Sequence, residues 1–161
     1  MTPSFVSPIT AAVSRNKENN SVSAFCYWAT NSGLTIRKSS EKEDKYDHID
    51  YYMGANGAEV SVDIKGEKDG QNRGLFLIEL NNVIGKTSWL FGKADYIAFQ
   101  EGETFLFVDR QKLAEYMAGF TFLNKGPKFC RAPHYYARFD RPKEKVTWIT
   151  RDELVKFSEE F

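Results

Sequence analysis

The 161-residue chain is long enough to bury a real core, and the simplest interpretation of residues 1–161 is one domain. Its hydrophobic content of 42% with 15% aromatic residues excludes a disordered chain. The 22 lysines and arginines balance 22 acidic residues, which excludes an overall basic field, so any nucleic-acid partner must be held by a local patch. No apolar run approaches the length of a membrane span, and we expect a cytoplasmic protein without a membrane partner.

A helical region opens the chain. Residues 7–8, Ser-Pro, are typical of an N-cap followed by a proline in the first helical turn. Apolar residues between positions 9 and 28 predict one long helix or two shorter ones, which end near Gly33. If there are two helices, we expect the break around residues 19–20.

A β-hairpin is predicted in the next third of the chain. Residues 33–40 form a short strand or an extended link, and the charge-rich residues 39–47 are predicted to be a loop. The stretch HIDYYM, residues 48–53, is a short strand, and GANG, residues 54–57, is a tight turn of the kind that joins hairpin strands. The stretch EVSVDIKG, residues 59–66, is expected to return antiparallel to the first strand.

Further strands and two helices complete the predicted fold. Apolar-rich strands are expected at residues 74–83, 94–100 and 104–110, and near the C-terminus at 145–149. Residues 109–120 have helical spacing, with Asp109 as the cap and Leu113, Tyr116 and Met117 on one side. A short helix is expected after residue 150. The pattern predicts an α+β (α/β) domain with a mixed sheet.

The strand at residues 59–66 carries an acid and a base on one face. Apolar residues alternate with Ser61, Asp63 and Lys65, which predicts a half-buried strand with a solvent-exposed polar face. Side-chain direction repeats every two residues, so Asp63 and Lys65 project from the same side. The tight turn would bring Asp50, on the preceding strand, to the same region of the sheet.

Two neighbouring carboxylates are costly unless a cation neutralises them. Oxygen ligands of this kind suit Mg²⁺ or Mn²⁺, which share the phosphate oxygens of a substrate and can lower the pKa of a bound water. Lys65 could orient the attacking water or stabilise the charge of the transition state. The alternative is a surface strand with a cross-strand ion pair.

The order of these residues resembles a nuclease superfamily. Asp50, followed by Asp63-Ile64-Lys65, matches the D…(D/E)-x-K core of the PD-(D/E)XK nucleases. The longer pattern is similar to small phage-type members of that superfamily, in four segments: His48 and Asp50; Asp63, Lys65 and Gly66; Glu79, Asn82, Val83 and Gly85; and Trp89, Leu90, Gly92, Ala94 and Asp95. The resemblance covers residues 45 to 113 and implies a restriction-endonuclease-like core, in which helices flank a central mixed sheet.

The resemblance also implies roles for individual residues. Asp50 and Asp63 would hold Mg²⁺ or Mn²⁺, and Lys65 would be the catalytic lysine. Glu79 could add a third carboxylate to the metal, or it could instead form a salt bridge with a lysine. Some superfamily members place an acid on the helix before the sheet, and Glu18 is the candidate here. His48 is expected to support the carboxylates by hydrogen bonding rather than to bind the metal.

Two segments could contact a nucleic acid. The loop from Lys86 to Lys93 mixes cations with Trp89 and Phe91, a composition that suits a backbone with a stacked base, although Trp89 could instead fill the core. The tail is locally basic, and it includes Lys125, Lys128, Arg131, Arg138 and Arg141 among aromatic residues. The alternative for the tail is ordinary surface charge around core aromatics.

Other kinds of site lack the residues that they need. The stretch GKTS at residues 85–88 resembles the end of a phosphate-binding loop, but position 80 is leucine instead of the glycine that the motif requires. Cys26 and Cys130 have no C-x-x-C spacing, and with the two histidines they show no zinc-ligand pattern. We therefore expect two reduced, buried thiols.

The sequence thus predicts a metal-dependent nucleic-acid phosphodiesterase, with DNA as the expected substrate and endonucleolytic cleavage as the expected reaction. If the protein is phage-encoded, it would act in the host cytoplasm. One alternative is a catalytically silent binding protein on a nuclease fold, which inhibits a host protein or binds nucleic acid. Another is a ribonuclease or a junction-specific nuclease. A homodimer is left open.

Overall fold

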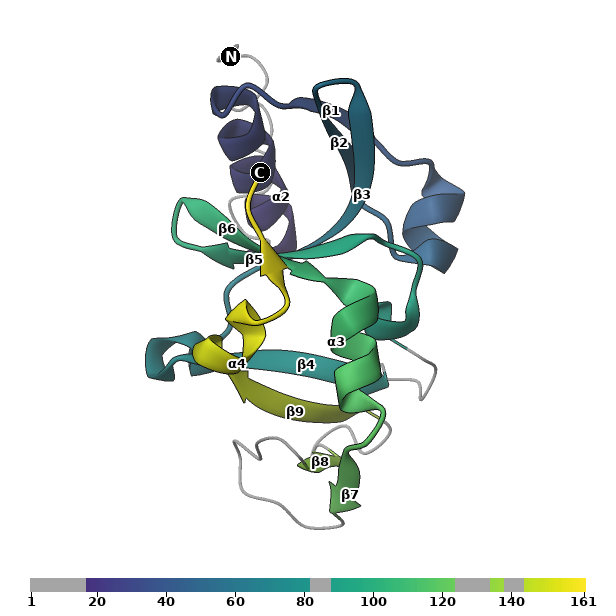
Figure 1. Cartoon of the computed structure of the whole chain (residues 1–161), viewed down its shortest axis with the longest axis vertical. Helices are drawn as coiled ribbons and strands as arrows, with labels where there is room; N and C mark the ends of the chain where they lie inside the picture. Colours follow the sequence, from purple (N-terminus) through teal and green to yellow (C-terminus); the bar gives the residue numbers. More distant parts are fainter. Residues whose placement is uncertain (1–16, 82–87, 124–133, 138–143) are drawn as a thin grey trace. The chain divides into compact units, whose positions relative to one another are not determined.

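The computed structural model describes residues 17–81, 88–123, 134–137 and 144–161, and the chain divides into two compact units (Figure 1). The first unit comprises Met1–Glu67, Ala94–Phe107 and Glu160–Phe161, and the second comprises Lys68–Lys93 and Val108–Glu159. Each unit is described by itself. Among the described residues, no helix is long and apolar enough to cross a membrane.

The first unit begins with a helix and an antiparallel ribbon. Helix α2 (Lys17–Asn31) runs without a break through residues 19–20 and ends before Gly33, whose φ of 81° reverses the chain. The expected end near Gly33 is confirmed, whereas a break at residues 19–20 is wrong. The proline-capped start at residues 7–8 lies outside the described residues.

Strands β1 (Thr35–Lys38), β2 (Tyr51–Ala55) and β3 (Ala58–Lys65) are antiparallel neighbours, with Lys38 paired with Tyr51 and Tyr51 with Val62. The turn between β2 and β3 consists of Asn56 and Gly57, with φ values of 54° and 80°. Two residues with positive φ match the right-handed twist of a hairpin, and this is why Asn-Gly is favoured there. The hairpin predicted at GANG is confirmed.

The segment before β2 differs from the expected loop and strand. Residues Glu43–Asp47 form a short π-helix, η1, instead of a loop. His48 follows η1 in the left-handed region, with φ 55°, so residues 48–50 are not part of a strand. β2 begins only at Tyr51, after this sharp change in chain direction.

The first unit's core lies between α2 and the sheet. Phe25, Cys26 and Ala29 of α2 pack with apolar side chains of the strands: Tyr51, Met53, Val62, Ile64, Ala98, Phe105 and Phe107. Phe25 meets the Phe105 ring edge-to-face at 5.5 Å. Cys26 is a buried free thiol, as expected, and burial raises its pKa. Cys130 lies outside the described residues.

The main sheet is mixed and has the order β1-β2-β3-β5-β6-β10. Its remaining strands are β5 (Tyr96–Glu101), β6 (Thr104–Asp109) and β10 (Ser158–Glu159). β3 pairs in parallel with β5, with Asp63 opposite Ile97 and Lys65 opposite Phe99. The predicted α+β fold, with a mixed central sheet and flanking helices, is confirmed.

The second unit contains a separate four-stranded sheet of order β4-β9-β8-β7 (Figure 1). Its strands are β4 (Leu75–Asn81), β7 (Thr121–Leu123), β8 (His134–Ala137) and β9 (Lys145–Thr150). β4 was expected to lie among the neighbouring strands of one sheet. Instead it pairs with β9, the strand predicted near the C-terminus, and Leu75, Leu77, Val146 and Trp148 form an apolar cluster between the two strands.

Short helices complete the second unit: the 3₁₀ helices η2 (Asp69–Arg73) and η3 (Trp89–Phe91), and the α-helices α3 (Arg110–Met117) and α4 (Arg151–Val155). The Asp109 carboxylate caps α3 by accepting a 3.0 Å hydrogen bond from the Lys112 N–H, as predicted. Leu113 and Met117 are buried, but Tyr116 is not part of the buried side of α3. Its exposed side chain donates a 2.8 Å hydrogen bond from the hydroxyl to Glu153.

Candidate active site

Asp50 is held at the open end of the β2–β3 hairpin by two backbone contacts with β3. Its N–H donates to the Val62 carbonyl at 2.8 Å, and its Oδ2 accepts a 2.7 Å hydrogen bond from the Ile64 N–H. These bonds place the Asp50 carboxylate next to the residues on either side of Asp63. The sequence-based expectation that the hairpin brings the two aspartates together is confirmed.

Asp63 is buried, which differs from the expected solvent-exposed polar face. It is 4% exposed, and Ser61 on the same side of β3 is 5% exposed. Its partner in the parallel pairing, Ile97 of β5, is a buried apolar residue. The alternative of a surface strand with a cross-strand ion pair is therefore wrong for Asp63, whose ion pair is with Lys65 of the same strand.

One oxygen of Asp63 is unsatisfied. Among the described residues, the buried Oδ2 has no hydrogen-bond partner. Its nearest cation is the ammonium of Lys65, which lies 3.4 Å away and is partly exposed. A buried carboxylate oxygen that has one ion-pair partner and no hydrogen bond is costly, because water no longer solvates it.

Burial and mutual repulsion change the acidity of the two aspartates. Burial, followed by the charge of Asp63 and a hydrogen bond with its carboxyl group, raises the pKa of Asp50 to about 7. Burial also raises the pKa of Asp63, and this effect is opposed by Lys65 and by the hydrogen bond with Asp50. Without a bound cation, the pair therefore tends to keep one proton near neutral pH.

Asp44 is a third carboxyl group in this cluster, and it belongs to none of the motifs in the sequence. It lies in η1, within the charged stretch predicted to be a loop. Its pKa is raised by burial, by the charge of Asp50 and by a hydrogen bond with Asp50, and it is lowered by Lys38 and His48. Only the fold of η1 brings Asp44 to Asp50, so sequence spacing alone gave no indication of it.

His48 is close enough to the carboxylates to interact with them electrostatically. Burial and the positive charge of Lys65 lower its pKa, while Asp50, Asp44 and Asp47 raise it. His48 ends η1 in the left-handed region, so it does not lie on a common strand face with Asp50. Its supporting role stays a prediction.

Asp95, the last residue of the W-L-x-G-x-A-D segment, fixes β5 against β3. Its Oδ2 accepts hydrogen bonds from the Ser61 N–H at 2.9 Å and the Ser61 hydroxyl at 3.1 Å, and its own N–H donates to the Ser61 carbonyl at 3.0 Å. Ser61 lies two residues before Asp63, so these bonds set the register next to Asp63. This contact is a structural role that the motif alone did not reveal.

The other two predicted acids lie on other elements of the fold. Glu79 lies on β4 of the second unit's sheet, opposite Val146, and so does not share a sheet with Asp63. Its role as a metal ligand stays a prediction. Glu18 falls in the first turn of α2, and its side chain lies outside the described residues.

The predicted nucleic-acid-binding residues are only partly described. Trp89 is buried, which fits the alternative that it fills the core, whereas Lys93 is exposed. Ser88 caps η3 by accepting a 3.2 Å hydrogen bond from the Leu90 N–H, so its hydroxyl serves the local fold. The other predicted cations, Lys86, Lys128, Arg131 and Arg138, lie outside the described residues.

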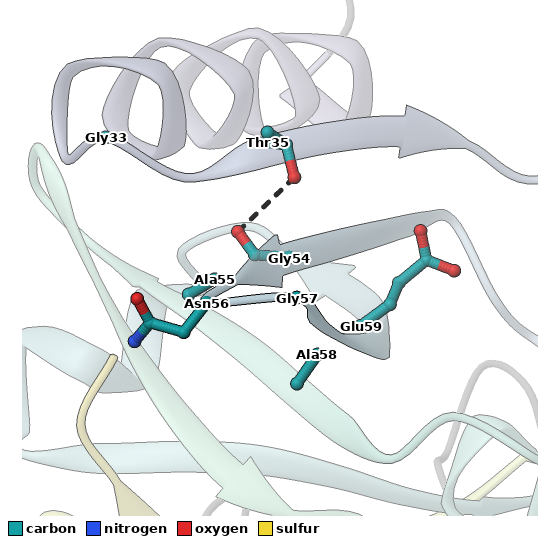
Figure 2. Close-up of a pocket in the computed structure, with 8 residues that line it drawn as sticks. All are labelled: Gly33, Thr35, Gly54, Ala55, Asn56, Gly57, Ala58 and Glu59. Carbon is teal, nitrogen blue, oxygen red and sulfur yellow. Dashed lines mark hydrogen bonds between the residues drawn. The ribbon is translucent and has the colours of Figure 1, made fainter.

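A pocket of about 380 Å³ lies at the opposite end of the hairpin, near the turn (Figure 2). It is lined by Gly33, Thr35 and residues 54–59, and the Thr35 hydroxyl donates a 3.3 Å hydrogen bond to the Gly54 carbonyl. Glu59, the charged residue in the lining, is paired with Arg37 at 2.7 Å. The pocket contains neither Asp50 nor Asp63.

Asp50 and Asp63 nevertheless fit a divalent cation. The described residues contain no group of three or more histidine, cysteine, aspartate or glutamate side chains placed to hold a metal ion. Mg²⁺ usually needs only one or two carboxylates, since waters and substrate phosphate complete its coordination. The unsatisfied Oδ2 of Asp63 beside Asp50 is the kind of oxygen that such a cation would neutralise.

Comparisons with family models, with curated proteins and with solved structures give no match for this chain.

Proposed function

We propose that this protein is a metal-dependent phosphodiesterase that cleaves nucleic acid, with DNA as the expected substrate and Mg²⁺ or Mn²⁺ as the cofactor. The observation that carries the proposal is the buried carboxylate of Asp63, whose Oδ2 has no hydrogen-bond partner among the described residues and which lies next to a second carboxylate and a lysine. The resemblance of Asp50 and Asp63-Ile64-Lys65 to the D…(D/E)-x-K nuclease core supports the same interpretation. The proposed place of action is the cytoplasm.

In this proposal Asp50 and Asp63 hold the cation. The cation would supply a Lewis acid and a more acidic bound water. The hydrogen bond from the Ile64 N–H orients the Asp50 carboxylate, and burial keeps competing water away from Asp63. The Lys65 ammonium, which is partly exposed beside Asp63, contacts the phosphate of the substrate and offsets the charge that develops in the transition state.

The test compares the parent protein with Asp63→Asn and Lys65→Met on labelled duplex, single-stranded and branched DNA and on RNA, each with Mg²⁺, Mn²⁺ or EDTA. We expect metal-dependent cleavage by the parent and a loss of at least about 100-fold in either variant, which is typical when one group that stabilises the transition state is removed. Lys42→Met, at an exposed residue just before η1, is the matched control for a lost lysine.

The proposal fails if the variants cleave as fast as the parent. It also fails if the parent cleaves none of the substrates and calorimetric titration shows no Mn²⁺ binding at millimolar concentration. Those two negative results together would favour the alternative of a catalytically silent binding protein. Cleavage confined to RNA or to branched DNA would keep the chemistry and change the substrate.

A further inference from the structure

A second feature of the molecule, in the four-stranded sheet of the second unit, points to contact with nucleobases. Phe122 of β7 is paired with Tyr135 of β8, and Ala137, two residues further along β8, is paired with Lys145 of β9. Paired residues and residues two apart share a face of a sheet. Phe122, Tyr135 and Lys145 therefore project from the same face, and we call these three residues the aromatic face.

The side chains of the aromatic face lie close to one another. The Phe122 and Tyr135 rings are 5.3 Å apart between centroids and tilted by 49°. The Lys145 ammonium lies 5.1 Å from the centroid of the Phe122 ring, within the range of a cation–π contact. Phe122 is 37% exposed, so part of its ring is open to a ligand.

The stretch of sequence that carries β7, β8 and the start of β9 is basic, although the whole chain is neutral. From Thr121 to Lys145 the sequence holds seven lysines and arginines against two acidic residues, while the chain as a whole has 22 of each. The remaining residues are therefore acidic on balance. An aromatic pair with an exposed Phe122 and a half-buried Tyr135, within a basic stretch of sequence, complements an anionic ligand that also carries flat rings.

We propose that the aromatic face binds single-stranded nucleic acid, with a base stacked on Phe122 and Tyr135 and a neighbouring phosphate held by Lys145. Nucleobases in a duplex are stacked on each other and cannot lie on a protein ring, so the inference selects an unpaired strand. It deepens the proposed function by naming the substrate class. It rests on that function only in taking nucleic acid as the ligand, and it needs no catalysis.

The experiment measures binding of the full chain to a fluorescent single-stranded oligothymidylate, a matched RNA and a duplex of the same length, in EDTA so that nothing is cleaved. The variants are Phe122→Leu, Lys145→Gln and the double variant. Leucine keeps the apolar character of residue 122 but removes the flat ring. Tyr27→Leu, at an exposed aromatic residue on α2, is the matched control.

We expect Phe122→Leu to weaken single-strand binding by at least about fivefold, the lower end of the effect of one stacked base. Lys145→Gln should reduce the slope of log K against log salt by roughly 0.7, the value for one phosphate contact on a single strand. Tyr27→Leu should bind like the parent, and duplex DNA should bind more weakly than the single strands.

The inference is overturned if Phe122→Leu binds like the parent, if Tyr27→Leu loses as much affinity, or if duplex binds more tightly than single strands. A loss of affinity that disappears on cooling, together with a lower melting temperature, would show a packing role and also overturn it. If the parent cleaves nothing and binds no Mn²⁺ but Phe122→Leu still loses affinity, this inference holds and the proposed phosphodiesterase fails. If the parent cleaves its substrate but Phe122→Leu binds normally, the proposed phosphodiesterase holds and this inference fails.

Discussion

The two ends of the β2–β3 hairpin are built on opposite principles. At the turn, Asn56 and Gly57 adopt the positive φ values that their residue types favour, and the pocket beside them is lined mainly by small residues (Figure 2). At the open end, roughly 20 Å away along β3, Asp50 and Asp63 are held together against their mutual repulsion. The turn end is locally favourable, whereas the open end is favourable only because the rest of the fold imposes it.

The open end of the hairpin is therefore the end at which the residues lower the stability of the fold. Buried carboxylates that need a cation are typical of functional sites, since a protein selected for stability alone would avoid them. Uncharged residues at positions 50 and 63 would leave the conformation of the Asn56-Gly57 turn unchanged. Substitutions at the two ends should therefore have different signatures: pH and metal dependence at the open end, and steric cost at the turn.

The largest expected effect is on the pH dependence of stability. The pKa of Asp50 is about 7 in the folded protein and 3.8 in an unperturbed aspartate, so the folded state keeps a proton that the unfolded state has released. The stabilisation from that proton is complete below about pH 4 and is lost as the pH rises to about 7. The loss is about 1.4 kcal/mol per pH unit while one extra proton is bound.

We therefore expect the metal-free protein to melt at a lower temperature at pH 8 than at pH 5. The Asp50→Asn variant should show a smaller change of melting temperature with pH, and at pH 8 it should melt at a higher temperature than the parent. Asparagine keeps an acceptor for the Ile64 N–H. His48 acts in the opposite direction because its pKa is lowered, and Asp63, Asp44 and Lys65 also face Asp50, so the difference between variant and parent is the informative quantity. If the melting temperatures of the parent and of Asp50→Asn change equally between pH 5 and pH 8, the raised pKa of Asp50 is contradicted.

An intermediate effect is expected at the turn end from Gly54→Ala. A Cβ at Gly54 would lie 2.8 Å from the Thr35 hydroxyl oxygen and 3.2 Å from the Ala58 carbonyl oxygen, so the Thr35 side chain must move and the β2–β3 backbone must give slightly. Such overpacking costs about 1–3 kcal/mol in the free energy of unfolding, measurable by urea denaturation. Metal binding should be unaffected, because the pocket does not include the aspartates.

Two further variants sharpen this measurement. Thr35→Ala in the Gly54→Ala background removes the hydroxyl and should restore part of the lost stability. Gly119→Ala, where a new Cβ meets nothing within 4 Å, should change the free energy of unfolding by less than about 0.5 kcal/mol. Equal costs at Gly54 and Gly119 would mean that the close approach of Thr35 and Ala58 to Gly54 has no energetic weight.

The same contrast explains which features could be predicted from sequence. The turn and the proximity of Asp50 to Asp63 follow from residues within one hairpin, where Asn-Gly and the strand period leave one arrangement. The burial of Asp63 depends on its parallel pairing with β5, a strand that comes much later in the chain. The alternation of polar and apolar residues in β3 therefore predicted a solvent-exposed face, but the fold buries Ser61 and Asp63 on that face.

Sheet membership was also beyond the local pattern. The apolar stretch of β4 was correctly predicted to be a strand, but nothing in it indicates that β9, from the far end of the chain, is its partner. Asp44 was missed for a related reason: a run of charged residues is typical of a loop, and only η1 together with the left-handed His48 brings it to Asp50. Long-range pairing and irregular backbone were the two sources of error.

The smallest effect is expected from Asp44→Asn. Asp44 is hydrogen-bonded to Asp50 and adds negative charge near Asp63, so in the proposed site it should orient and strengthen the Asp50–Asp63 pair without being needed for it. Removing a carboxylate that supports a metal ligand typically lowers metal affinity by about tenfold. Calorimetric titration with Mn²⁺ should show this loss for Asp44→Asn, little change for Asp47→Asn on the same π-helix, and no detectable binding for Asp63→Asn. If Asp44→Asn and Asp47→Asn bind Mn²⁺ equally well, the hydrogen bond between Asp44 and Asp50 has no influence on the metal, and the cluster is limited to the hairpin.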